Sequence, residues 1–223
     1  MKCMLRSLLT DPMFAVTAIG ACVFVAAALC APAAEAGKTI VDEWASVKAP
    51  PPPELQSVTV DPKTMALLML DLQNQNCDPE RRPRAVASLP KIQALLTQSR
   101  RNGMPVVYSL TRSATKDDIR SEVAPLSVEP AVQAGVDKFY GTDLQGILRS
   151  RGVQTVIIVG TSAHGAVLHT AAGAAMRGFN VIVPVDGMSA DDPYAEQYTA
   201  WHLANSPGTR SQTTLTRIGL IRF

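Results

Sequence analysis

Short, nearly uninterrupted apolar runs recur along the chain from residue 66 onward. They comprise residues 66–70, 105–110, 155–159 and 181–185. A continuous run is typical of a strand that is buried on both faces, as the strands of parallel sheets are. Apolar or small residues three and four positions apart predict helices at residues 89–102, 143–150 and 166–177. Each of these segments ends at a glycine, which suits the left-handed end of a helix: Gly103, Gly152 and Gly178.

The alternation of strands and helices predicts a three-layer α/β/α sandwich with a mainly parallel central sheet. Ligands of such sheets bind beyond the carboxyl ends of the strands. The residues that follow the strands therefore carry the most chemical interest: Asp71, residues 109–112, residues 160–166 and Asp186.

Asp71 closes the most apolar of these runs and is followed by Leu72. A carboxylate that neighbouring leucines partly shield from water suits a general acid or base. The alternative is that Asp71 only caps a helix or accepts hydrogen bonds from loop amides.

Residues 160–166 form a glycine-containing turn from a strand into a helix rich in small residues. The amides of such a turn can hold an anion or an oxyanion, although tight packing alone also favours small residues there. His164 lies in this turn and can reach a pocket, whereas His169 and His202 are expected to be packed or surface residues. No Asp-x-His or His-x-His pair occurs, so neither a metal site nor a cofactor is predicted.

The first 36 residues have the order of a signal peptide. Lys2 and Arg6 precede an apolar stretch at residues 13–29, and Ala34-Glu35-Ala36 follows it. This order predicts cleavage after Ala36, with an uncleaved membrane anchor as the alternative. The chain after Ala36 keeps Cys77 as its single cysteine, so no intrachain disulfide is expected. The expected location is periplasmic or secreted, without membrane attachment after cleavage.

Residues 37–62 contain a run of four prolines, Pro50 to Pro53, and no sustained periodicity. They are predicted to form an extended Pro-rich arm outside the core, or an arm that docks on a neighbouring subunit. The domain proper is then expected at residues 63–223. The net charge of +2 is too small to attract nucleic acid to a broad surface.

Five collinear motifs resemble the isochorismatase-like hydrolases, also called the cysteine hydrolase superfamily. They are residues 70–74 (LDLQN), 103–108 (GMPVVY), 139–144 (FYGTDL), 158–164 (IVGTSAH) and 178–186 (GFNVIVPVD). The resemblance covers about residues 65–223 and implies the same three-layer sandwich. It also implies a small-molecule substrate and a homo-oligomer.

The resemblance further implies an aspartate after the first strand, a lysine before the Phe-x-Gly-Thr segment and a cysteine nucleophile at the start of a helix. The aspartate corresponds to Asp71, but the cysteine position falls on Ala166. The family spacing places the lysine at Gln133, with Lys138 as the alternative. On this basis the candidate catalytic residues are Asp71, Lys138 and His164, and the candidate substrate-binding residues are Gln73, Ser162, Ala163, Gly165 and Ala166.

These residues predict an exported hydrolase of a small molecule that forms no covalent thioester, because a thioester requires a thiolate. Asp71 would be its general acid or base. True isochorismatases, which hydrolyse a vinyl ether, also dispense with the cysteine. Two alternatives stay open: a catalytically inactive binding or scaffolding protein on the same fold, and an amidase whose nucleophile is Cys77.

Overall fold

The computed structural model describes residues 37–223, and the predicted signal peptide lies outside the described residues. Residues 49–223 form one compact unit, and residues 37–48 belong to a separate one. In the latter, Thr39 caps a short helix, α1 (Ile40–Glu43), which a 3-10 turn at Trp44–Ser46 follows. None of the helices in residues 37–223 combines the length and the apolar character that a membrane span requires.

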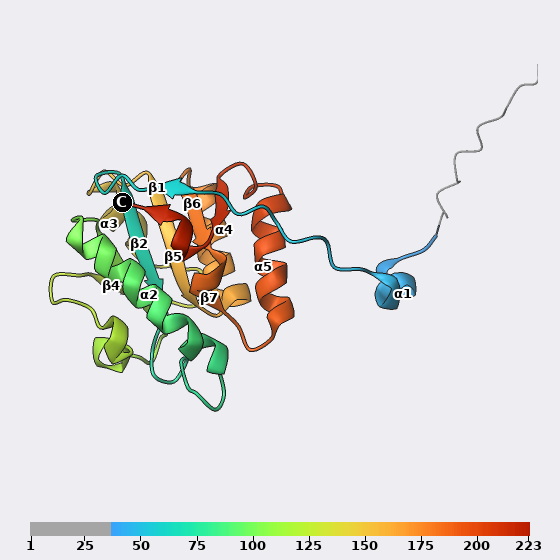
Figure 1. Ribbon diagram of the computed structural model, residues 1–223, viewed down its shortest axis with the longest axis horizontal. Helices are drawn as coiled ribbons and strands as arrows, with labels where there is room; N and C mark the ends of the chain where they lie inside the picture. Colours follow the sequence, from blue (N-terminus) through green and yellow to red (C-terminus); the bar gives the residue numbers. More distant parts are fainter. Residues whose placement is uncertain (1–36) are drawn as a thin grey trace, which may run out of the picture. The chain divides into compact units, whose positions relative to one another are not determined.

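The compact unit is built on a parallel sheet (Figure 1). Its four most buried strands are those that the apolar runs predict: β2 (Met65–Leu70), β3 (Val106–Leu110), β5 (Thr155–Thr161) and β6 (Asn180–Pro184). Two strands that the sequence analysis did not predict, β4 (Ala131–Gln133) and β8 (Thr213–Thr216), form the edges of the order β4-β3-β2-β5-β6-β8. The short β7 (Met188–Ser189) pairs with the end of β5.

Helices cover both faces of this sheet. They are α2 (Pro83–Arg101), α3 (Leu144–Arg149), α4 (Leu168–Met176) and α5 (Pro193–Asn205), with a π-helical turn at Ala163–Val167 before α4. Shorter 3-10 turns lie at Lys116–Asp118, Ser121–Val123, Val185–Gly187 and Ile218–Leu220. Gly103, Gly152 and Gly178 have φ of 71°, 72° and 77°, so the predicted left-handed helix ends are confirmed.

The core consists of two apolar clusters, one on each face of the sheet. Successive side chains of a strand point to opposite faces, so Leu67 and Met69 of β2 pack with α2, while Leu68 and Leu70 pack with α3, α4 and α5. In Figure 1, α2 crosses one face of β2. The predicted three-layer α/β/α sandwich with a parallel sheet is therefore confirmed.

The end of the predicted arm belongs to the core, which corrects the expectation that residues 37–62 lie outside it. Val58 and Val60 are buried, and β1 (Val58–Thr59) pairs in parallel with β9 (Ile221–Arg222). Leu55 also packs against the core. The strand partner of β1 lies at the far end of the chain, so no local pattern identifies this pairing.

Candidate functional site

Asp71 lies at the carboxyl edge of the sheet, directly after β2, and both of its carboxylate oxygens have a partner. Oδ1 accepts a hydrogen bond from the Ser109 hydroxyl at 2.7 Å, and Oδ2 accepts one from Lys138 Nζ at 2.7 Å. Asp71 is 5% exposed and Lys138 is 0% exposed. A buried ion pair therefore occupies the position at which ligands of parallel sheets bind.

The backbone around Asp71 is shaped for this arrangement. Asp71 has φ of 50°, a left-handed conformation that aspartate adopts more readily than most residues. Its N–H donates to Ser109 Oγ at 3.2 Å, so one serine holds both the backbone and the side chain. Outliers of this kind cost about 1–3 kcal/mol and concentrate at functional sites.

Gly160 brings the end of β5 close to the end of β2. It pairs with Leu70 in the sheet register, and its φ is 137°. A Cβ at this position would stand 2.1 Å from the Leu70 carbonyl oxygen. Only glycine fits there, and its presence places the turn that follows β5 beside Asp71.

Lys138 is held by hydrogen bonds in the segment between β4 and α3. Its Nζ also donates to the Gly135 carbonyl at 2.6 Å, and its backbone N–H donates to Thr170 Oγ1 of α4 at 3.2 Å. The Thr170 hydroxyl donates in turn to the Val136 carbonyl at 3.3 Å. The ammonium group is therefore directed at Asp71 by contacts that span more than one element.

Gln133, the alternative position for the family lysine, points elsewhere. Its side chain is exposed, and its amide donates to the carbonyls of Ala114 at 2.8 Å and Thr111 at 3.3 Å. Of the two positions that the spacing left open, Lys138 is thus the one in contact with Asp71. Gly135 and Thr170, which orient it, are residues that the sequence analysis missed, because their contacts form between segments distant in the chain.

The turn after β5 is closely packed. Ala163 and Ala166 are buried and belong to the same core cluster as Leu70. The peptide bond between Thr161 and Ser162 is cis. A Cβ at Gly165 would stand 2.5 Å from Ser162 Oγ, so a larger residue there would require the Ser162 side chain to move.

The structure does not bring two of the other candidates into contact with Asp71 through their side chains. His164 is exposed, and its side chain makes no hydrogen bond with another residue of 37–223. Gln73 is completely buried. Its Oε1 accepts a hydrogen bond from Asn76 Nδ2 at 2.7 Å, and its Nε2 donates one to the Ser109 carbonyl at 3.5 Å. Gln73 therefore holds the loop after β2 together.

Cys77 is buried in the cluster on the α2 face of the sheet. Desolvation raises the pKa of its thiol to about 11. The thiol is therefore protonated at neutral pH, and the thiolate that a nucleophile requires is scarce.

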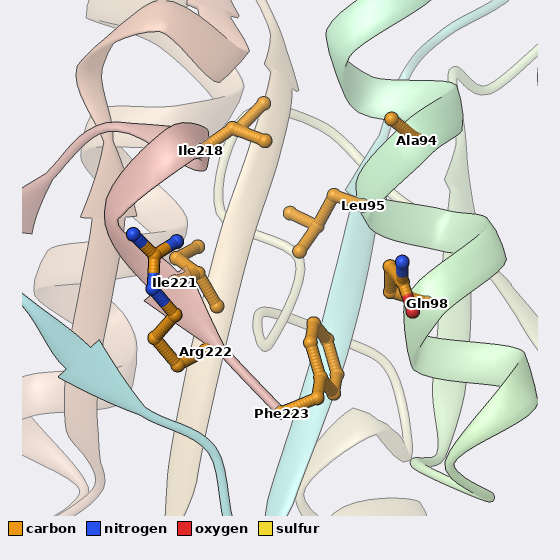
Figure 2. A pocket seen from close by; sticks show the side chains of 7 residues that line it. All are labelled: Ala94, Leu95, Gln98, Ile218, Ile221, Arg222 and Phe223. Carbon is orange, nitrogen blue, oxygen red and sulfur yellow. The ribbon is translucent and has the colours of Figure 1, made fainter.

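Two further observations bear on other kinds of site. Within residues 37–223, no group of three or more His, Cys, Asp or Glu side chains is arranged to hold a metal ion. A separate cavity of about 370 Å³ lies between α2 and the C-terminal segment, where Leu95 and Gln98 face Ile221 and Phe223 (Figure 2). Its lining includes no carboxylate, histidine or cysteine side chain, so it lacks the groups that hydrolysis uses for proton transfer.

Comparison with known proteins places this fold among hydrolases. The Isochorismatase domain family matches residues 65–215. N-carbamoylsarcosine amidase from Arthrobacter sp is 25% identical over 179 residues, which cover 66% of this chain and 68% of that protein. A secreted isochorismatase effector from Verticillium dahliae is 28% identical over 146 residues, which cover 60% of this chain and 77% of that protein.

Solved structures agree with this assignment of the fold. The N-carbamoylsarcosine amidase of Thermoplasma acidophilum superposes with a TM-score of 0.60 at 26% identity, covering 70% of this chain and 96% of that one. The nicotinamidase of Staphylococcus aureus superposes with a TM-score of 0.61 at 20% identity, covering 70% of this chain and 98% of that one. The latter similarity concerns the fold alone.

Proposed function

The chain belongs to the isochorismatase family, and we propose that it is a hydrolase of a small molecule in which Asp71 transfers protons and no thioester forms. The observation that carries this proposal is the buried Lys138–Asp71 pair at the carboxyl edge of the sheet. A buried, ion-paired carboxylate at a ligand-binding edge is a candidate acid–base group.

Asp71 can act as base and then as acid in a single hydrolysis. As a carboxylate it accepts a proton from a water molecule, which then attacks the substrate, and it returns the proton to the leaving atom. Lys138 and Ser109 hold one carboxylate oxygen each, so the carboxylate is oriented before the substrate arrives. The turn after β5 follows Gly160, which pairs with Leu70 in the β2–β5 register, and the amides at its start are the proposed donors to developing negative charge. The N–H groups of Gly165 and Val167 are not among them, because both donate to the Ser162 carbonyl.

A thioester route is not part of this proposal because neither candidate position supplies a thiolate. The resemblance places the family nucleophile at Ala166, whose methyl group has no nucleophilic atom. Cys77 is buried, and its pKa is raised to about 11. Water is therefore the proposed nucleophile.

We further propose that the protein is exported and acts in the periplasm or outside the cell. Residues 1–36 have the basic, apolar and small-residue order of a signal peptide. The relative from Verticillium dahliae is named a secreted effector, which supports export of this fold. Homo-oligomeric assembly stays a prediction.

Turnover assays of the purified protein against vinyl ethers, amides and ureides test the proposal. Asp71→Asn is expected to lower kcat by about 100-fold or more, since positioned acid–base groups contribute at least that factor. Asp117→Asn is the matched control, because Asp117 is exposed and has no hydrogen-bond partner among residues 37–223. Full activity of Asp71→Asn would refute the assigned role.

A catalytically inactive binding protein on the same fold is the second candidate. Ala166 favours it, because the turn beside Asp71 is retained while the family nucleophile position holds a methyl group. Specific binding of a compound from these classes, without turnover of any of them, would support this second candidate over the first.

A further inference from the structure

One face of α4 contacts the chain segment that carries Lys138. Thr170, Gly173 and Arg177 are three and four positions apart, so they lie on the same side of the helix, with Arg177 directly after its last residue. Thr170 is completely buried, and its hydroxyl holds the N–H of Lys138 and the carbonyl of Val136. The helix therefore contacts the backbone of the residue that bears the ammonium group.

Arg177 contacts both chain neighbours of Lys138. Its Cζ lies 4.9 Å from the centre of the Phe139 ring, a distance typical of a cation–π interaction. Its Nη1 lies 4.0 Å from Asp137 Oδ2 and donates a hydrogen bond to the Gly173 carbonyl at 2.9 Å. The guanidinium is thus fixed to α4, and it touches the residues directly before and after Lys138.

The lack of a side chain at Gly173 leaves room for these contacts. A Cβ there would stand 2.8 Å from Asp137 Oδ1 and 3.2 Å from Arg177 Nη1. Asp137 Oδ1 also accepts a hydrogen bond from the N–H of Phe139 at 2.9 Å, so this carboxylate is held by its own segment. A larger residue at position 173 would therefore displace the carboxylate and the turn around Lys138 with it.

A second arginine stacks on the same aromatic pair without touching the neighbours of Lys138. The rings of Phe139 and Phe179 stack with their centres 5.9 Å apart. Arg149 lies over the Phe179 ring at 4.1 Å and donates a hydrogen bond to the Arg177 carbonyl at 3.0 Å. Within residues 37–223, no hydrogen bond, ion pair or cation–π contact joins Arg149 to residues 137–139. The two arginines therefore offer a matched comparison.

We propose that Arg177 is a positioning residue, which holds Lys138 Nζ against Asp71 by fixing the residues on either side of Lys138. The inference rests on the proposed function, since it concerns the ion pair that carries that function. A lysine side chain is long and flexible, so the direction of its ammonium group depends on how firmly the backbone beneath it is held. Gly173 serves the same arrangement, because it lets Asp137 approach α4 closely.

The test follows the ammonium protons of Lys138 by proton–nitrogen NMR. Lys138 is the one fully buried lysine of residues 37–223, so its ammonium protons exchange slowly with water, and Lys138→Arg assigns their signal by its loss. Arg177→Met is expected to raise the exchange rate by about ten-fold, the effect of losing one partly exposed cation–π contact together with one ion pair. Arg177→Lys is expected to restore part of the protection, because a positive charge remains beside Asp137.

Arg149→Met is the matched control, since it removes the other arginine of the aromatic pair. Thermal unfolding is expected to show a similar loss of Tm in Arg149→Met and Arg177→Met, because each variant loses one cation–π contact. Ammonium exchange is expected to stay at the wild-type rate in Arg149→Met. An unchanged exchange rate in Arg177→Met, or an equal rise in Arg149→Met, would overturn the inference.

Gly173→Ala separates the positioning role from helix stability by the sign of its effect. Alanine is favoured over glycine inside a helix, so helix propensity alone would raise the Tm and leave ammonium exchange no faster. The inference instead expects faster exchange, because the new Cβ would displace the Asp137 carboxylate. A higher Tm with exchange at or below the wild-type rate would count against the inference.

Kinetics on a vinyl ether, amide or ureide that the wild type hydrolyses complete the test. Arg177→Met is expected to lower kcat by about ten-fold or more and to leave KM unchanged, since a misplaced ammonium group slows the reaction without removing a substrate contact. An unchanged kcat would overturn the inference. The NMR measurement needs no turnover, so slow exchange that requires Arg177 in a protein that hydrolyses none of these compounds would refute the proposed function and still support the positioning role.

Discussion

Replacing Lys138 by methionine would remove the ammonium group that pairs with Asp71 while keeping a side chain of similar length. Lys138 is completely buried, and its Nζ lies 2.7 Å from Asp71 Oδ2 and 2.6 Å from the Gly135 carbonyl. At this separation, the attraction between the charges amounts to about 6 kcal/mol for an effective dielectric constant of about 20. Most of this attraction offsets the cost of removing both ions from water.

The single variant is expected to be far less stable than the wild type. It leaves a buried carboxylate whose remaining side-chain partner is Ser109, and broken buried pairs typically lose about 3–5 kcal/mol of unfolding free energy. Asp71→Asn is expected to lose a similar amount, because it leaves the buried ammonium without a counter-charge. The double variant, Asp71→Asn with Lys138→Met, contains no unpaired charge and is expected to lose less than either single variant.

Urea unfolding at pH 7, followed by circular dichroism, measures these free energies. Lys63→Met is the control, since Lys63 is exposed and its ammonium group makes no hydrogen bond or salt bridge within residues 37–223. Its charge acts on the exposed Asp61 only as the last of the causes that lower the pKa of that carboxyl. The variant is therefore expected to change stability by less than about 0.5 kcal/mol. If Lys138→Met lost less than about 1 kcal/mol, or if the losses of the two single variants simply added in the double variant, the reasoning from a coupled buried pair would be refuted.

Three further predictions concern the backbone and the thiols. Gly160→Ala should lower the free energy of unfolding by more than about 3 kcal/mol, because the new Cβ would stand 2.1 Å from the Leu70 carbonyl oxygen. Gly103 is also left-handed, but nothing obstructs a Cβ there, so Gly103→Ala should lower the free energy of unfolding by about 1–2 kcal/mol in the same assay. Cys77 should resist alkylation by iodoacetamide below pH 10 in the folded protein. In urea, the pH dependence of its alkylation should have a midpoint at about 8.5. Rapid alkylation of the folded protein at pH 8 would contradict its burial. In a Cys77→Ser background, Ala166→Cys introduces a thiol in the turn after β5. If the adjacent amides favour an anion, the pH midpoint of its alkylation should lie below about 8.5. An unshifted midpoint would favour the inactive binding protein.

The central strands were predictable because their physical cause is local. A strand that is buried on both faces is apolar along its buried length, and residues 66–70 and 156–159 show this directly. The edge strands β4 and β8 contain glutamine and threonine and are short, so their sequences resemble those of loops. Their strand character depends on the neighbouring strand, which local sequence does not reveal.

The sequence by itself determined the four central strands of the sheet, the left-handed glycines at the helix ends and the position of Asp71 after a buried strand. Tertiary structure alone decided that Lys138, 67 residues later in the chain, lies against Asp71, and that Gln133 does not. It also decided that the end of the arm joins the core through the pairing of β1 with β9. Hydrophobic periodicity depends only on neighbouring residues in the chain. The direction of a buried ammonium group depends instead on how loops fold around it, through contacts such as those of Gly135 and Thr170 with Lys138.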